Sequence, residues 1–182
     1  MVIIVIISII AIVVIGIIGW VIRTSNRFKI LKVKIDEADS GIDVALTKRH
    51  DTLTKMLDVV KAYAKHEVET FTQIVNLRKG MNIAEKTEAN KCMDEIVKGI
   101  NVLAEAYPEL RSSDNFIKLK SAISETETHL QAARRLYNSN VSIFNQAIVV
   151  FPASIIANSQ NHTPRDFFEA DETSRTDVKM NF

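Results

Sequence analysis

The sequence is poor in the residues that cross-link a chain or break its helices. Its 182 residues include one cysteine, five glycines and three prolines, and the first proline is Pro108. A single cysteine excludes an internal disulfide framework and is typical of a reducing compartment. Glycine and proline are scarce, while Ala, Leu, Lys and Glu are plentiful after the opening segment. This composition predicts long helices and argues against a sheet.

The sequence also lacks an excess of charge of either sign. The formal net charge is +1, from 23 basic and 22 acidic residues. No overall positive field would attract nucleic acid, and the one basic cluster follows directly after the opening apolar segment. We therefore expect no nucleic-acid partner.

What the sequence has in abundance is apolar residues in its opening segment. No charged side chain occurs before Arg23. About twenty apolar residues form roughly 30 Å of helix, which is the thickness of the hydrocarbon core of a bilayer. We predict a transmembrane anchor over residues 1–23, with Trp20 where an interfacial ring would lie. The residues assigned to the anchor and its flank are Ile3, Ile10, Gly16, Gly19, Trp20, Arg23, Arg27 and Lys29.

Two other interpretations of this segment are weaker. A cleaved signal peptide has a basic leader, a shorter apolar core and a small-x-small cleavage site, whereas this segment has no Lys or Arg before Arg23 and no Ala-x-Ala pattern after it. A buried core helix would need more soluble protein around it, because this run is apolar on every face. The transmembrane interpretation is the one we adopt.

The charges that follow the segment predict its orientation. Five basic residues lie just after it: Arg23, Arg27, Lys29, Lys32 and Lys34. The positive-inside rule then predicts a single-pass protein of the cell membrane, with its N-terminus outside and the bulk of the chain in the cytoplasm. The five charges either contact anionic headgroups or serve only as a stop-transfer flank.

Beyond the anchor, the apolar periodicity predicts three long helices and a short fourth. The long helices are expected over residues 28–77, 84–106 and 116–151, and the short one over 153–157. We predict an all-α fold, in which the transmembrane helix is followed by an elongated antiparallel helical bundle with coiled-coil-like packing. The bundle is assigned to residues 24–158, and a polar C-terminal tail that is partly docked to 159–182.

Glycine and proline mark the expected ends of these helices. Gly41 is the candidate kink of the first helix, and Gly80 is free to adopt a left-handed conformation in a turn after it. Pro108 should end the second helix at or just before Tyr107, and Pro152 should end the third.

Several separated motifs recur along the chain in a fixed order. They are Ile42–Asp51, Tyr63–Glu67, Glu105–Leu110, Thr126–Glu127, Ala133–Asn138, Phe144–Asn145, Phe151–Pro152 and Phe167–Ala170, with a terminal aromatic, Phe182. This pattern resembles the LemA family of bacterial proteins along nearly the whole chain. The motif residues that we single out are Arg49, His50, Asp51, Tyr107, Pro108, Arg134, Tyr137, Asn138, Asn145, Phe151 and Pro152. The resemblance implies a membrane-anchored helical bundle with its domain in the cytoplasm, and it implies no enzymatic reaction.

The residues themselves offer little for catalysis. The four histidines form neither a His-Glu-x-x-His nor a Glu-x-x-His pattern, and they fit surface or helix-end positions better than metal ligands. Lys48, Arg49, His50 and Asp51 are consecutive, so on a helix they point in different directions, and we expect Arg49 to pair across helices. Cys92 is expected to be an inert thiol. We expect no enzyme, no cofactor and no metal site.

Two sets of residues are candidates for an interface. Gln131, Asn138 and Asn145 recur every seven residues beside the apolar stripe of the third helix, either as ordinary boundary residues or at a subunit or partner interface. The second helix is too short to cover the membrane-proximal part of the first, so an apolar stripe there should lack an intramolecular partner. That stripe comprises Ile30, Leu31, Val33, Ile35 and Ile42.

These features predict a non-enzymatic scaffold or interaction protein that self-assembles as a homo-oligomer at the cytoplasmic face of the membrane. The alternative is an adaptor or sensor for a membrane protein partner, such as a protease or kinase, with no assembly of its own. A hydrolase or metalloenzyme would need a ligand cluster that the residue spacing does not provide.

Overall fold

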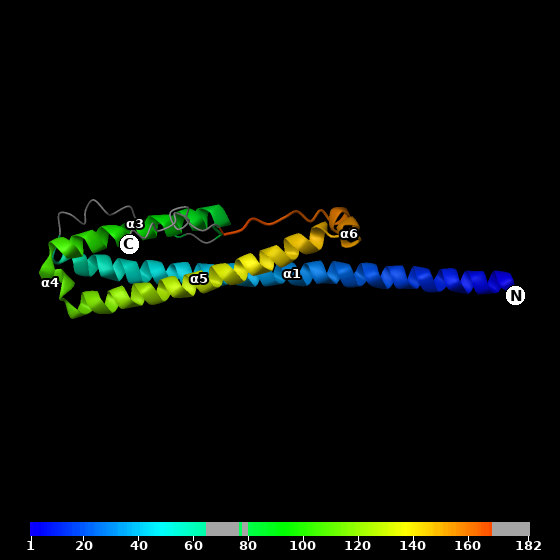
Figure 1. The fold of residues 1–182 in the computed structure, drawn as a ribbon, viewed down its shortest axis with the longest axis horizontal. Coiled ribbons are helices and arrows are strands. Elements are labelled where there is room, and N and C mark those ends of the chain that lie inside the picture. Colours follow the sequence, from blue (N-terminus) through cyan, green and yellow to red (C-terminus); the bar gives the residue numbers. More distant parts are fainter. Residues whose placement is uncertain (65–76, 78–79, 169–182) are drawn as a thin grey trace, which may run out of the picture. The chain divides into compact units, whose positions relative to one another are not determined.

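A computed structural model describes residues 1–64, 77 and 80–168 of the chain, and within these residues the regular structure is entirely helical (Figure 1). The helices are α1 (Val2–Lys61), α3 (Ile83–Ala106), α4 (Pro108–Arg111), α5 (Asp114–Val149) and α6 (Ala153–Ser159). The prediction of an all-α protein that begins with an apolar helix is confirmed for the described residues.

The chain divides into two compact units, and both α1 and α5 contribute to each of them. Unit 1 comprises Met1–Ala38 and Asn138–Asp166. Unit 2 comprises the described residues from Asp39 to Tyr137 together with Phe167 and Phe168.

Helix α1 is longer at one end and shorter at the other than the sequence predicts. It joins the apolar opening segment to the first bundle helix without interruption and continues through Gly41. A break at Gly41 does not occur, because the residues on either side, Ala38 and Ile42, are buried and their packing outweighs the glycine penalty of about 1 kcal/mol. The helix ends at Lys61, where the amide of Tyr63 bonds the carbonyl of Val60 in a tighter turn.

The sequence predicts that this helix continues to Leu77. This prediction is wrong for residues 62–64, which are not helical. No glycine or proline lies near Lys61, so the sequence has no helix-breaking residue that would predict the end of α1 there. The rest of the predicted segment, apart from Leu77 itself, and the residues after Phe168 lie outside the described part of the chain.

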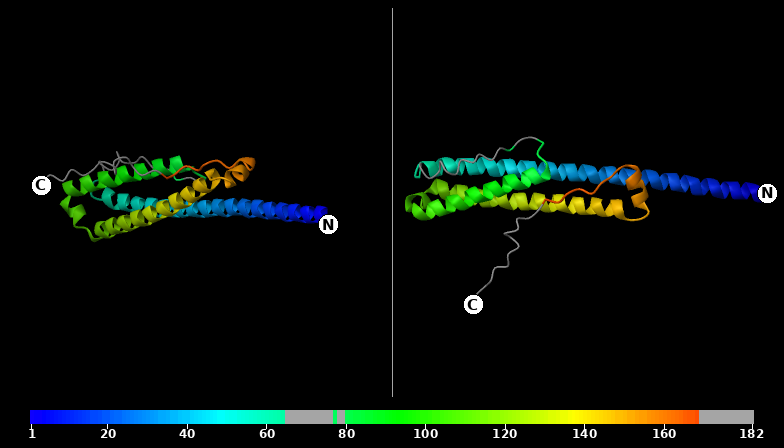
Figure 2. Two further views of the ribbon diagram at one scale, coloured as in Figure 1. Left: turned by 45° about the vertical axis from the view of Figure 1, so that its right-hand side comes forward. Right: turned by 90° about the horizontal axis from the view of Figure 1, so that it is seen from above.

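In unit 2, α3 runs in the same direction as α1, which corrects the antiparallel prediction for this pair (Figures 1 and 2). Lys86 at the start of α3 contacts Asp39 and Asp43, whereas Asp94 further along α3 contacts Arg49 further along α1. The parallel direction is possible because α1 ends early. The connection over residues 62–82 can span up to about 70 Å when extended, while the 24 residues of α3 cover about 36 Å.

Helix α5 runs against α1 in unit 2, where Glu125 near its start contacts Lys48, and in unit 1, where Asn140 donates to the carbonyl of Lys34 at 3.0 Å. The figures show the same opposed directions within each unit (Figure 2). A 36-residue helix is long enough to contribute to both units.

Local chemistry explains the ends of the shorter helices. Asn82 caps α3 and forms a capping box with Glu85, while Gly80 has φ +83°, the left-handed conformation expected from the sequence. Helix α3 ends at Ala106 with Tyr107 as its cap, as predicted from Pro108. Pro108 then opens the short α4, which the sequence analysis did not predict.

Helix α5 ends at Val149, three residues before Pro152, and the Phe151–Pro152 peptide bond is cis. Helix α6 follows at an angle of 98° to α5.

Each unit has an apolar core formed by the inner faces of these helices. In unit 1 the core residues include Phe28, Leu31, Ile35, Val141, Phe144, Ile148, Ile156 and Ala157. In unit 2 they include Ile42, Leu46, Met56, Met93, Ile100, Leu110, Phe116 and Leu130. Burying one large apolar side chain contributes roughly 1.5–3 kcal/mol, so these inner faces supply the main stabilisation of both units.

Candidate functional site

The first feature that points to a function is the opening segment of α1. Within the described residues, α1 is the one unbroken helix that is long and apolar enough to cross a membrane, and none of the side chains in its apolar stretch is buried. Ile3 and Ile10 are exposed, and nothing lies within 4 Å of the positions that a Cβ would occupy on Gly16 and Gly19. Trp20 is 38% exposed, which leaves its ring open to the surroundings.

The basic flank of this segment is also exposed. Arg23, Arg27 and Lys29 lie at the surface of unit 1, directly after the apolar stretch. The exposed apolar stretch of α1 is therefore followed directly by three exposed basic residues, Arg23, Arg27 and Lys29, which we call the cationic collar.

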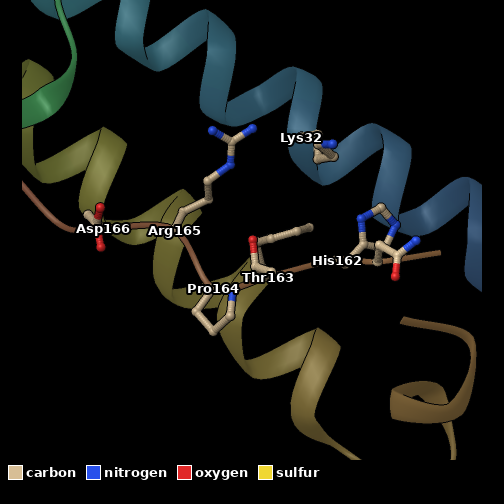
Figure 3. A pocket seen from close by; sticks show the side chains of 8 residues that line it. Lys32, His162, Thr163, Pro164, Arg165 and Asp166 are labelled. Atoms are coloured by element: carbon tan, nitrogen blue, oxygen red, sulfur yellow. The ribbon is translucent and has the colours of Figure 1, made fainter. Parts of the chain in front are cut away.

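A pocket of about 290 Å³ opens in unit 1 between α1, α5 and the segment that follows α6 (Figure 3). It is lined by Lys32, Phe144, Asn161, His162, Thr163, Pro164, Arg165 and Asp166. The side chain of Arg165 extends from the segment toward α1, which carries Lys32 (Figure 3). Two cations therefore border the pocket, with Asp166 as the acidic group among the lining residues.

His162 holds the segment after α6 against the core of unit 1. Its imidazole packs edge-on against Phe28 and Phe144, with ring centroids 5.2 and 5.9 Å away. Burial lowers the pKa of His162 below its usual 6.5, and the nearby charge of Lys32 lowers the pKa further. The neutral imidazole is therefore the form that fits this position.

His162 was predicted to lie at a surface or helix end, and its packing against the two phenylalanines was not predicted. The packing depends on the preceding residue, Asn161, which has φ +54° and turns the chain sharply at the end of α6. The amide of His162 then bonds the carbonyl of Ala157, which directs the ring back toward α1 and α5.

The three amides spaced by seven residues lie in different surroundings. Asn145 bonds Arg165 twice: its Oδ1 accepts from the Arg165 amide at 2.8 Å, and its Nδ2 donates to the Arg165 carbonyl at 2.9 Å. Asn138 is half-buried in unit 1, and Gln131 is exposed in unit 2. The side chain of Asn145 therefore behaves as a boundary residue that fixes a segment of its own chain.

The apolar stripe proposed for the first helix is only partly exposed. Ile35 and Ile42 are 3% and 0% exposed, so the prediction that they lack an intramolecular partner is wrong. The second helix was predicted to be too short to cover these residues, but α5, with 36 residues, is long enough to return beside α1. Ile30 and Val33 remain 57% and 64% exposed in unit 1.

Unit 2 contains two buried cations that bind α1 to α3. Arg49 is 2% exposed, donates to Asn90 and forms an ion pair of 2.5 Å with Asp94, which meets the expectation of a partner across helices. Lys86 is 1% exposed and lies 2.7 Å from a carboxylate oxygen of both Asp39 and Asp43.

The Lys86 cluster was missed by sequence reasoning, although its signal was present. Lys86 stands seven residues before Met93, which is on the apolar stripe of α3, so its side chain belongs to the same buried face. Asp39 and Asp43 are four residues apart and share a face of α1.

The remaining motif residues serve the local structure. Tyr107 and Pro108 form the junction of α3 and α4, and Tyr137 is 4% exposed. The guanidinium of Arg134 lies 4.5 Å above the ring of Phe168, so two separated motifs meet in unit 2.

The remaining members of the motif set lie at the surface. His50 lies 3.7 Å from Asp51, its neighbour in the chain. Phe151 is 77% exposed beside Pro152. Within the described ranges, no group of three His, Cys, Asp or Glu side chains is placed to hold a metal ion.

Comparison with known proteins gives a consistent result. The model of the LemA family matches residues 38–182, so the match begins inside α1, after the apolar stretch. Protein LemA of Metamycoplasma hominis is 31% identical over 150 residues, which cover 80% of this chain and 68% of that protein.

Proposed function

The chain belongs to the LemA family, and we propose that it is a membrane-anchored helical interaction protein that self-associates next to the bilayer. The observation that supports this most is the continuity of α1. Its apolar opening stretch is exposed on all sides, and the same helix continues into the cores of both units. Because α1 is one helix, a membrane anchor at its start is joined to the packed units without a linker.

The cationic collar sets the proposed orientation. Arg23, Arg27 and Lys29 are exposed directly after the apolar stretch, and the positive-inside rule places such a cluster on the cytoplasmic side. Both helical units then lie in the cytoplasm, and the start of α1 faces outward.

The proposed surface for self-association is the exposed side of α1 just beyond the collar. Ile30 and Val33 are separated by three residues, so they lie on one face of the helix, and both are more than half exposed. Two parallel copies anchored in one membrane would bring these faces to the same height. This surface replaces Ile35 and Ile42, whose side chains are buried.

We propose no catalytic role, and the packing supports that choice. The buried charges of unit 2, Arg49 and Lys86, are each paired with carboxylates on the neighbouring helix. Their chemistry serves to hold α1 against α3, not to act on a substrate.

Cysteine cross-linking in membranes tests the proposal. In a Cys92→Ser background, Val33→Cys should form a disulfide-linked dimer on mild oxidation of native membranes. Leu136→Cys is the control, because it is also an exposed apolar residue but lies on α5 in unit 2. Equal yields from both variants, or no dimer from either, would contradict self-association through this face. A monomer that cross-links to a different protein would instead support the adaptor role.

A further inference from the structure

The junction between α5 and α6 exposes a cluster of apolar side chains. Val149, Val150, Phe151 and Ile155 are between 57% and 77% exposed, and they stand at a bend of 98° between the two helices. We call these four residues the elbow. Four large apolar side chains exposed so close together in the chain point to an interaction site.

The elbow lies in unit 1, close to the end of the apolar stretch of α1. Gln160, directly after α6, donates from its Nε2 to the hydroxyl of Ser25 at 2.8 Å. Ser25 is three residues beyond Ile22, which corresponds to about 4.5 Å along the helix axis. Helix α6 therefore lies beside α1 where the membrane span would end (Figure 2).

The charges of unit 1 are mainly basic. Residues 1–35 and 138–165 contain no Asp or Glu, and the three acids of unit 1, Asp36, Glu37 and Asp166, stand at the edges of these stretches. The basic residues in these two stretches are Arg23, Arg27, Lys29, Lys32, Lys34 and Arg165. A basic surface with exposed apolar side chains matches the interface of an anionic bilayer, where each nearby cation contributes about 1 kcal/mol and apolar side chains enter the headgroup boundary.

A full membrane crossing by this part of the chain does not fit its packing. Taken together, α5 and α6 are apolar enough to count as a bent span. The inner face of α5, however, is occupied, because Phe144 and Ile148 are 1% and 5% exposed in the core of unit 1. Only the outer side of the junction is available to lipid.

From these observations we infer that the elbow is a second membrane contact, which seats Phe151 and its apolar neighbours in the interface of the same anionic leaflet that receives the end of the α1 span. The inference rests on the proposed membrane anchorage by α1. With two contacts, unit 1 is held against the membrane surface at α1 and at α6.

Site-directed spin labelling of the full-length protein in vesicles tests this inference. In a Cys92→Ser background, labels are placed at Phe151→Cys and, independently, at Ile155→Cys. Leu136→Cys is the control, because it is also an exposed apolar residue of α5 and belongs to unit 2. The depth of each label is measured from its relative accessibility to oxygen and to a water-soluble nickel complex, in vesicles of phosphatidylcholine with and without phosphatidylglycerol.

We expect the labels at 151 and 155 to shift toward the lipid in the anionic vesicles, with a smaller shift in neutral vesicles, while the label at 136 stays in water. Labels at 151 and 155 that are as accessible to nickel as the label at 136 would overturn the inference. Spin–spin broadening between copies without lipid exposure would overturn it as well, since the elbow would then be a protein interface. Labels at 151 and 155 that enter the lipid to the same depth with and without phosphatidylglycerol would overturn the role of the basic residues.

A label at Ile10→Cys separates this inference from the proposed function. Lipid exposure at Ile10 together with an aqueous elbow refutes the second contact alone. An aqueous label at Ile10 refutes the anchor itself.

Discussion

At the scale of single residues, Lys86 and its two carboxylates show how a polar contact can set the direction of a helix. The Lys86 side chain is buried, whereas Asp39 and Asp43 retain 36% and 55% of their side-chain exposure. The two acids therefore stay partly hydrated, and the cost of desolvation falls mainly on the lysine. Reversing α3 would move Lys86 away from both acids and leave its charge unpaired, so the contact favours the parallel direction.

Removing the two carboxylates should destabilise unit 2 more than removing the lysine. Asp39→Asn combined with Asp43→Asn leaves a buried charge without a partner, which costs roughly 3–5 kcal/mol. Adding Lys86→Met to this pair should restore most of the loss, because an apolar side chain of similar length fills the same space. Urea unfolding of the full chain in detergent measures both variants, and equal stability of the double and triple variants would contradict the account.

His162 should make unit 1 sensitive to acid. The folded pKa lies below the unfolded value of about 6.5, so the unfolded chain binds the proton more tightly. Stability is therefore complete above about pH 6.5, falls as the pH drops through the window between the unfolded and folded pKa, and then levels off.

The control for this effect is His162→Phe, which keeps an aromatic ring between Phe28 and Phe144 and removes the titrating group. Thermal unfolding of the full chain in detergent is followed from pH 8 to pH 5 for both proteins. The wild type should lose more stability than the variant below about pH 6.5. Parallel curves would mean that His162 has no such role.

At the scale of elements, α1 contains a glycine, Gly41, whose conformational freedom the helix does not require. Gly41 is exposed in the middle of α1, and a Cβ added there would meet no atom within 4 Å. Gly80 differs, because its φ of +83° is unfavourable for any residue with a side chain. The same substitution should therefore have opposite effects at the two positions.

Gly41→Ala should stabilise the protein by about 0.5–1 kcal/mol, because alanine lowers the entropy of the unfolded chain and fits the helix. Gly80→Ala should destabilise it by about 1 kcal/mol through strain in the left-handed conformation. Denaturant midpoints of the two variants measure both effects. A destabilising Gly41→Ala would show that α1 needs flexibility at this point.

The elements that were predicted from sequence are those with a strong local signal. Pro108 correctly predicted the end of α3 at Tyr107, and Gly80 correctly predicted a left-handed turn. The long apolar period of α5, ending before Pro152, gave a helix within a few residues of the observed one. In each case a residue type with a fixed backbone preference marks the boundary.

The features that were missed depend on contacts far apart in the chain. The end of α1 at Lys61 has no breaking residue, and a first helix that reached residue 77 would leave too few residues before α3 for a parallel arrangement. The burial of Ile35 and Ile42 likewise depends on which helices pack against α1 at these positions, which the apolar periodicity of the first helix does not reveal. The packing of His162 between two phenylalanines required the turn at Asn161 to be known.

At the scale of the whole molecule, one helix is exposed and apolar at its start and packed in the helical cores further along. In water such an exposed stretch would be costly, since each fully buried side chain of this size is worth roughly 1.5–3 kcal/mol. A bilayer would remove that cost, and in the proposed orientation the basic residues after the stretch would remain on the cytoplasmic side.

The most direct test of this account is the labelling of single cysteines with a membrane-impermeant maleimide in intact and lysed cells. In a Cys92→Ser background, the account predicts that Val2→Cys is labelled in intact cells. Ser124→Cys, exposed on α5 in unit 2, should be labelled only after lysis. Labelling of Ser124→Cys in intact cells would contradict the proposed orientation. Release of the protein into the medium from intact cells would contradict the proposed anchor.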